Sequence, residues 1–91
     1  MLDDTSSRYY SYDELSSMST YDLYLARNEI YARHGRMFKD PNLQAYFNNK
    51  TWYTPIYTPE QWDATQSIAD VESKNAALML EVEQERHSSY L

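Results

Sequence analysis

The chain has 91 residues, a formal net charge of −6 and no cysteine. This length indicates one small domain, and the missing thiols exclude disulfides, thiolate metal sites and a cysteine nucleophile. The acidic balance argues against nonspecific binding to nucleic acid or anionic membrane, and no apolar run approaches the roughly 18 residues of a membrane-spanning helix.

The N-terminal part contains two signals for helix starts. Residues 1–10 have little apolar content and no periodicity, which predicts a flexible arm. Ser11 and Glu14 match a capping box, so we expect a short helical turn that ends near Ser17. Ser19 is placed to cap a second helix, because its hydroxyl can accept hydrogen bonds from the amides that follow it.

The first long helix is expected from Thr20 to His34, because residues of one face recur at helical spacing. This face comprises Leu23, Ala26, Arg27, Ile30 and His34. Gly35 is the only glycine, and it stands where helices often end on a left-handed residue. We expect Gly35→Ala to cost about 1 kcal/mol through backbone strain at positive φ.

Two shorter helices are predicted in the middle of the chain. Asp40–Pro41 starts the first, since aspartate caps and proline fits the first turn, and the helix ends near Asn49. Residues 50–59 are expected to form an ordered loop. Thr58 begins a further capping box, which predicts a turn of helix through Trp62.

The longest predicted helix closes the chain, from about Ser67 to Glu85. Its stripe, with spacings of three and four residues, comprises Ala64, Ile68, Val71, Asn75, Leu78 and Val82. No strand is predicted, because apolar residues rarely alternate. The expected fold is all-α, a small single-domain helical fold with two main helices and two or three short helices. We expect a helical domain over 11–86 between the arm at 1–10 and a frayed tail at 87–91.

Residues 27–35 carry a specific motif, with Tyr-Ala-Arg-His-Gly at residues 31–35. This run resembles the YARHG domain, which is named for those five residues, and the similarity covers about Ser19 to Glu85. The positions outside residues 31–35 that are similar are Ser19, Leu23, Leu25, Arg27, Asn28, Phe38, Leu43, Tyr46, Phe47, Trp52, Tyr53, Pro55, Glu72, Asn75 and Leu78.

The resemblance implies a bacterial module that lies outside the cytoplasmic membrane, extracellular or in the cell envelope. It implies no enzymatic activity and no established ligand, so no catalytic residue is carried over. One departure concerns the closing helix, which in relatives begins with a small polar cap near Ile68. Ser67 and Ala69 flank that position here, so the sequence places the first residue of this helix only to within several positions.

His34 has the chemistry of an acid, a base or a metal ligand. The only other histidine is His87, in the predicted tail, and no spacing typical of a zinc motif is present. We therefore expect a structural or interface role for His34, with no metal, no cofactor and no enzymatic activity.

Arg27 and Asn75 each interrupt an apolar helical stripe, where a polar group must be paired or have its tip in water. We predict that the two long helices meet there in one buried hydrogen-bonded network. The residues of this network are Arg27, Asn28, Tyr31 and Asn75. The alternative is that the same residues form a ligand site.

The candidate ligand-binding residues are Arg33, His34, Arg36 and Tyr53. Tyr53, Tyr57 or Trp62 is expected to be exposed beside the basic cluster of Arg33, Arg36 and Lys39. Aromatic faces next to arginines suit a glycan, a peptidoglycan stem peptide or an anionic cell-wall polymer. The alternative is that these rings and charges share one side of a small tyrosine-rich domain by accident.

The predicted function is a non-catalytic extracellular binding or adaptor module of a bacterial cell-envelope protein, with cell-wall polymer or an envelope protein as partner. The alternative is a protein–protein interaction or structural spacer domain without a small-molecule ligand. An exposed apolar strip at Leu78–Val82, or at Met79–Leu80, would favour this alternative. We expect a monomer without a nucleic-acid partner and without membrane insertion, and no signal peptide pattern is present.

Overall fold

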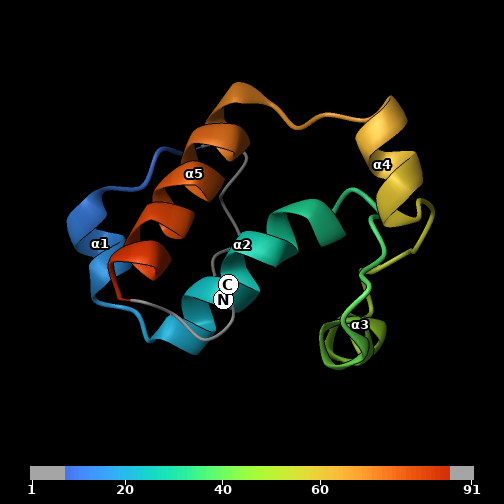
Figure 1. Cartoon of the computed structure of the whole chain (residues 1–91), viewed down its shortest axis with the longest axis horizontal. Helices are drawn as coiled ribbons and strands as arrows, with labels where there is room; N and C mark the ends of the chain where they lie inside the picture. Colours follow the sequence, from blue (N-terminus) through green and yellow to red (C-terminus); the bar gives the residue numbers. More distant parts are fainter. Residues whose placement is uncertain (1–7, 87–91) are drawn as a thin grey trace. The chain divides into compact units, whose positions relative to one another are not determined.

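The computed structural model describes residues 8–86, which form helices and no strand (Figure 1). The helices are α1 Tyr12–Ser16, α2 Thr20–Ala32, α3 Pro41–Asn48, α4 Pro59–Thr65 and α5 Asp70–Glu85. The predicted all-α class is confirmed. Residues 1–7 and 87–91, with the predicted tail and His87, lie outside the described residues.

The chain divides into two compact units. The first unit comprises residues 1–30 and 69–91, and the second comprises residues 31–68. Helices α1 and α5 and most of α2 therefore belong to the first unit, and α3 and α4 to the second. Among the described residues, no helix combines the length and apolar character needed to cross a membrane.

Four short-range caps set the starts of helices as predicted, and before α2 the Ser19 hydroxyl accepts from the Asp22 amide at 3.1 Å. The Ser11 hydroxyl accepts from the Glu14 amide, and the Glu14 carboxylate accepts from the Ser11 amide at 3.0 Å. Asp40 accepts from an amide in the first turn of α3. Thr58 and Gln61 make the same reciprocal pair before α4, although α4 runs to Thr65, beyond the single turn expected.

Helix α5 begins later than predicted, at Asp70 instead of Ser67. Ala69 holds the cap position and has no side-chain acceptor. The Glu72 carboxylate instead accepts a hydrogen bond from the Ala69 amide at 3.2 Å. This bond uses the part of a capping box that does not need a polar cap residue. The small polar cap of the family pattern is therefore not required for this start.

Helix α2 is buried on most of its circumference. Leu23, Ala26 and Ile30 of the predicted face are at most 1 % exposed. Residues on other sides of the helix are buried too, among them Leu25 and Glu29. Burial on these other sides, beyond the predicted face, indicates that packing contributes much of the stability of this helix.

The first unit has its core between α1, α2 and α5. Leu15, Leu23, Met79 and Val82 are each at most 1 % exposed. Figure 1 shows α1 lying against α5. Since Met79 and Val82 are buried in this core, the exposed apolar strip on α5 that would favour a protein-interaction domain is not present.

Side chains at the C-terminal end of α5, Glu85 and the cap residue Arg86, hold both ends of α1. The Arg86 guanidinium donates to the carbonyl of Ser16 and, at 2.6 Å, to that of Met18. The Ser16 carbonyl lies in the last turn of α1 and the Met18 carbonyl follows it. Carbonyls at a helix end have no amide of the same helix to bind, so the guanidinium supplies the missing donors. The Tyr12 hydroxyl donates to the Glu85 carboxylate, and this bond and the charge of Glu85 raise the pKa of Tyr12.

The last residues of the predicted arm are fixed to α5. The Asn75 amide accepts from the Tyr10 backbone amide at 2.9 Å and donates to the Arg8 carbonyl at 2.8 Å. The Tyr10 side chain is only 8 % exposed. The expectation of a flexible arm is therefore corrected for residues 8–10, because a buried side-chain amide supplies the backbone partners that a helix or sheet would otherwise provide.

Candidate functional site

The turn at Gly35 places three of the four candidate ligand-binding residues. Gly35 has φ +90°, so the predicted left-handed residue is confirmed. Its amide donates to the Ala32 carbonyl at 2.9 Å, and the Arg36 amide donates to the Tyr31 carbonyl at 3.3 Å. These two bonds define a Schellman motif. Helix α2 therefore ends at Ala32, before the predicted His34, and the motif turns residues 33–36 away from the helix axis.

A segment from the middle loop closes over this turn. The Gly35 carbonyl accepts from the amides of Ile56 and Tyr57, at 2.8 and 3.0 Å. The Met37 amide donates to the Tyr57 carbonyl at 2.7 Å, which completes an isolated parallel bridge. The loop predicted over residues 50–59 is thus ordered by backbone hydrogen bonds to the turn that follows α2.

Tyr53 is a structural residue and not an exposed ligand contact. Its side chain is 9 % exposed, and its hydroxyl donates to the Arg36 carbonyl at 2.7 Å and accepts from Gln44 at 3.2 Å. Trp62, another ring expected to be exposed, is 5 % exposed. Of the three rings offered as alternatives, Tyr53 and Trp62 are therefore buried and Tyr57 is half-buried, because a small domain rich in tyrosine and poor in large aliphatic residues uses its rings as core.

Arg33 and Arg36 both stand over aromatic rings in the second unit. The Arg33 guanidinium lies 4.6 Å from the ring centre of Trp52, and Arg33 is exposed. Arg36 is half-buried and lies 5.2 Å from the ring centre of Phe38 and 5.9 Å from that of Tyr31. Such cation–π contacts order a guanidinium without neutralising its charge.

His34 is exposed and lies beside Trp62, with a distance of 6.1 Å between ring centres and a tilted arrangement. The rings of Tyr31 and Tyr57 also pack against Trp62 in edge-on geometry, each with 6.0 Å between ring centres. The imidazole thus extends an aromatic cluster. Among residues 8–86, no group of three or more histidine and acidic side chains is arranged to hold a metal ion.

The four residues of the predicted network lie in separate arrangements. Arg27 forms a forked ion pair with Glu83 at 2.7 and 3.3 Å. Asn28 donates to the Tyr24 carbonyl one turn earlier in α2, at 2.9 Å. Asn75 binds the N-terminal segment, and Tyr31 belongs to the second unit with its ring against Trp62.

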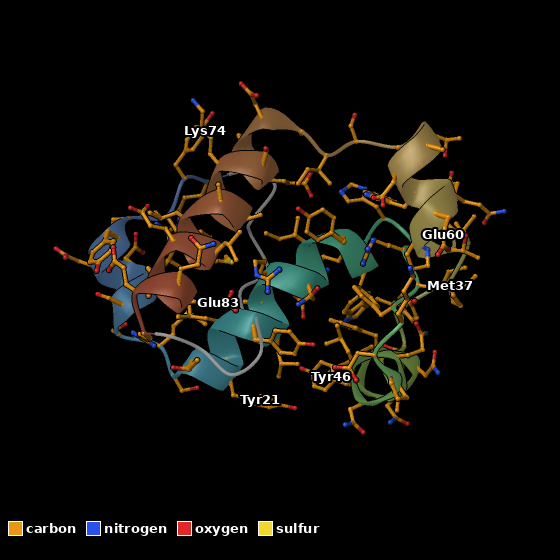
Figure 2. The ribbon with its side chains drawn as sticks, viewed as in Figure 1. Tyr21, Met37, Tyr46, Glu60, Lys74 and Glu83 are labelled. Atoms are coloured by element: carbon orange, nitrogen blue, oxygen red, sulfur yellow. The ribbon has the colours of Figure 1, made fainter. Side chains whose placement is uncertain are left out.

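Glu83 is the partner of Arg27 that the sequence analysis missed. Figure 2 shows Glu83 on the side of α5 that faces α2. Its side chain is 0 % exposed, and that of Arg27 is 18 % exposed. A signal existed, because Glu83 directly follows Val82 of the buried stripe and a buried carboxylate needs a cation.

Charge is distributed unevenly along the chain. Residues 31–68 contain four basic and three acidic side chains, whereas the rest of the chain contains four basic and eleven acidic ones. Lys39 pairs with Glu60 at 3.0 Å, and this contact lowers the pKa of Glu60. Lys39 is therefore partly neutralised, and the basic cluster depends mainly on the arginines.

Comparison with known proteins identifies the family. The family model of the YARHG domain matches residues 1–84, so the match includes the N-terminal segment before Ser19 as well as the motif and α5. No curated protein and no solved structure was found to match the chain. With nearly its whole length covered by the family model, the chain belongs to the YARHG domain family.

Proposed function

We propose that this chain is a non-catalytic binding module of a bacterial cell-envelope protein, that it lies outside the cytoplasmic membrane, and that its ligand is an anionic cell-wall polymer. The observation that carries the proposal is Arg33, which is exposed and is held over the Trp52 ring. A guanidinium ordered on a ring keeps its positive charge, which attracts a carboxylate or phosphate. It also loses less side-chain freedom when an anion binds.

The rest of the second unit supports this surface. Arg36 lies on two rings, and residues 31–68 have a net positive balance on a chain that is otherwise acidic. His34 borders the same turn and contributes a further polar edge. An exposed apolar strip on α5 would favour the alternative role as a protein-interaction or spacer domain, and Met79 and Val82 are buried there instead.

A cell-wall pull-down tests the proposal. Purified bacterial cell walls should retain the wild-type chain at low salt, and Arg33→Ala and Arg36→Ala should each reduce the retained fraction. Lys74→Ala is the matched control, because Lys74 is also an exposed cation over a ring, at 5.5 Å from Tyr9, but belongs to the first unit. No retention of the wild-type chain, or equal losses in all three variants, would contradict the proposed surface.

A further inference from the structure

The backbone segment that carries Arg36 is bonded on both of its edges. One edge makes the isolated parallel bridge to the middle loop. On the other edge, the Tyr53 hydroxyl donates to the Arg36 carbonyl at 2.7 Å. The side-chain oxygen of Gln44 accepts from the Phe38 amide, also at 2.7 Å. Residues i and i+2 of an extended segment present their backbone groups on the same edge, so the side chains of Tyr53 and Gln44 take the place of a neighbouring strand.

Tyr53 and Gln44 form a connected pair with contacts of their own. The Gln44 side-chain nitrogen donates to the Tyr53 hydroxyl at 3.2 Å and to the Asn48 side chain, one turn later in α3, at 2.9 Å. The Tyr53 ring packs against Phe47, which is completely buried, with 5.9 Å between ring centres. Because both side chains are fixed elsewhere, they can hold the backbone of residues 36–38 in one position.

The position of this backbone also sets the position of the Arg36 side chain. Side chains of residues i and i+2 lie on one face of an extended segment, and the Arg36 guanidinium lies 5.2 Å from the ring centre of Phe38. The Phe38 ring is buried and stacks on Phe47 at 5.1 Å. A shift of the backbone between Arg36 and Phe38 would therefore move the guanidinium relative to a ring that is itself fixed.

The charge of Arg36 is not neutralised by an acidic side chain. Among residues 8–86, Arg36 has no carboxylate partner, whereas the Lys39 ammonium group meets the Glu60 carboxylate at 3.0 Å. Contact with an aromatic ring leaves the net charge unchanged. Arg36 is half-buried, so only part of its guanidinium faces solvent. Its orientation therefore decides which N–H groups an oxygen of a carboxylate or phosphate can reach.

We propose that Tyr53 and Gln44 are positioning residues for anion binding by Arg36. Neither residue contacts the ligand, and together they hold the backbone that orients the guanidinium over Phe38. This inference rests on the proposed function. It gives Tyr53, which the sequence suggested as a ligand contact, an indirect role in the same site, and it adds Gln44, which was not a sequence candidate.

Tyr53→Phe tests the inference because it removes the hydroxyl and keeps the ring. The full chain is titrated with purified bacterial cell walls at low salt, and the retained fraction gives an apparent affinity. Tyr53→Phe should weaken binding roughly threefold to tenfold, the cost of ordering one flexible side chain when an anion binds. Gln44→Met, with a side chain of similar length, should weaken binding by a similar factor because the Phe38 amide loses its acceptor.

Tyr46→Phe is the matched control. The Tyr46 ring also packs against Phe47, at 5.1 Å, but its hydroxyl makes no hydrogen bond within the part of the chain that the structure describes. This variant should bind cell walls within about twofold of wild type. A loss as large as that of Tyr53→Phe would overturn the inference. Thermal melts establish that every variant is folded at the temperature of the titration.

A double-mutant cycle separates positioning from a general structural effect. If Tyr53 acts through Arg36, Tyr53→Phe should change the affinity by less than about twofold in a chain that already carries Arg36→Gln. A general loosening of the second unit would weaken binding by the same factor with and without Arg36. Equal factors in the two backgrounds would overturn the inference.

Nuclear magnetic resonance follows the Arg36 side chain without any ligand. The ring current of Phe38 shifts the signals of the Arg36 δ-methylene and ε protons. In Tyr53→Phe these signals should move towards their values in an unstructured chain, and in Tyr46→Phe they should stay in place. Unchanged signals in Tyr53→Phe would overturn the inference whatever the result with cell walls.

The outcomes distinguish the inference from the proposed function. Wild-type affinity of Tyr53→Phe for cell walls overturns the inference and leaves the proposed function standing. If cell walls do not retain the wild-type chain, the proposed function fails, and the binding role of Tyr53 and Gln44 fails with it even where the Arg36 signals move.

Discussion

Replacing Gly35 by alanine tests the geometry on which the candidate site depends. At φ +90°, an L-residue pays roughly 1–2 kcal/mol for the left-handed backbone. A Cβ atom there would also lie 3.1 Å from the Thr54 carbonyl oxygen and 3.1 Å from two carbon atoms of Ile56. Crowding of this kind typically costs about 1–3 kcal/mol.

The Ile56 side chain and the Thr54 carbonyl differ in how easily they can move away from the added Cβ atom. Ile56 is 56 % exposed, so its side chain can move aside at small cost. The Thr54 carbonyl cannot retreat freely, because the following amides of Ile56 and Tyr57 are bonded to the Gly35 carbonyl. We therefore expect Gly35→Ala to lose about 2–4 kcal/mol, more than the backbone strain alone. For a domain of this size the melting temperature should fall by about 10–20 °C.

The assay is thermal unfolding followed by circular dichroism, with three comparison variants. Gly35→Asn should lose less than Gly35→Ala, because asparagine tolerates the left-handed region better. Adding Ile56→Ala to Gly35→Ala should recover only a small part of the loss. Ala77→Gly, at an exposed position in α5, calibrates the assay at about 1 kcal/mol. A melting temperature for Gly35→Ala within about 2 °C of wild type, under 1 kcal/mol, would refute the account of this turn.

The remaining predictions concern the ion pairs of the first unit. Glu83→Ala should cost about 3 kcal/mol in urea unfolding, because Arg27 keeps a largely buried charge without its partner. The double variant Arg27→Met with Glu83→Leu should have a larger free energy of unfolding than Glu83→Ala. A smaller value for the double variant would contradict the idea that the unpaired Arg27 charge causes the loss. The hydrogen bond from Arg8 lowers the pKa of Glu14 from its usual 4.5 to about 2, with a further contribution from the amide of Ser11. Because the folded pKa is the lower one, the stabilisation is complete above about pH 4.5 and is lost as the pH falls through about 2. The melting temperatures of wild type and Glu14→Gln should therefore converge over this pH range, and a constant difference would contradict the assignment.

Local signals predicted the starts of α1, α2, α3 and α4 and the left-handed residue after α2. Ser11, Asp40 and Thr58 cap their helices through atoms no more than three residues away, so sequence spacing alone specifies the geometry. The left-handed Gly35 has the same origin, because the Schellman bonds lie within one turn. The start of α5 was placed three residues early because Ala69 offers no side-chain cap, and only the bond from its amide to Glu72 marks the start.

The candidate site was predicted only in part. Arg33, His34 and Arg36 follow from the helix end and its turn, and the structure places all three in the second unit. Tyr53 was misjudged because burial of a tyrosine depends on which distant groups accept its hydroxyl, here the Arg36 carbonyl.

The sequence by itself determined the family, the helical class and the caps, because these depend on residue type at spacings of a few positions. Only the tertiary structure decided the polar partners: Glu83 for Arg27, 56 positions apart, and the backbone of Arg8 and Tyr10 for Asn75, more than 60 positions apart. A buried polar group must be paired, but any complementary group that packing brings within about 3 Å can satisfy it. Spacing along the chain therefore predicts that Arg27 and Asn75 need partners and leaves the choice of partner to the fold.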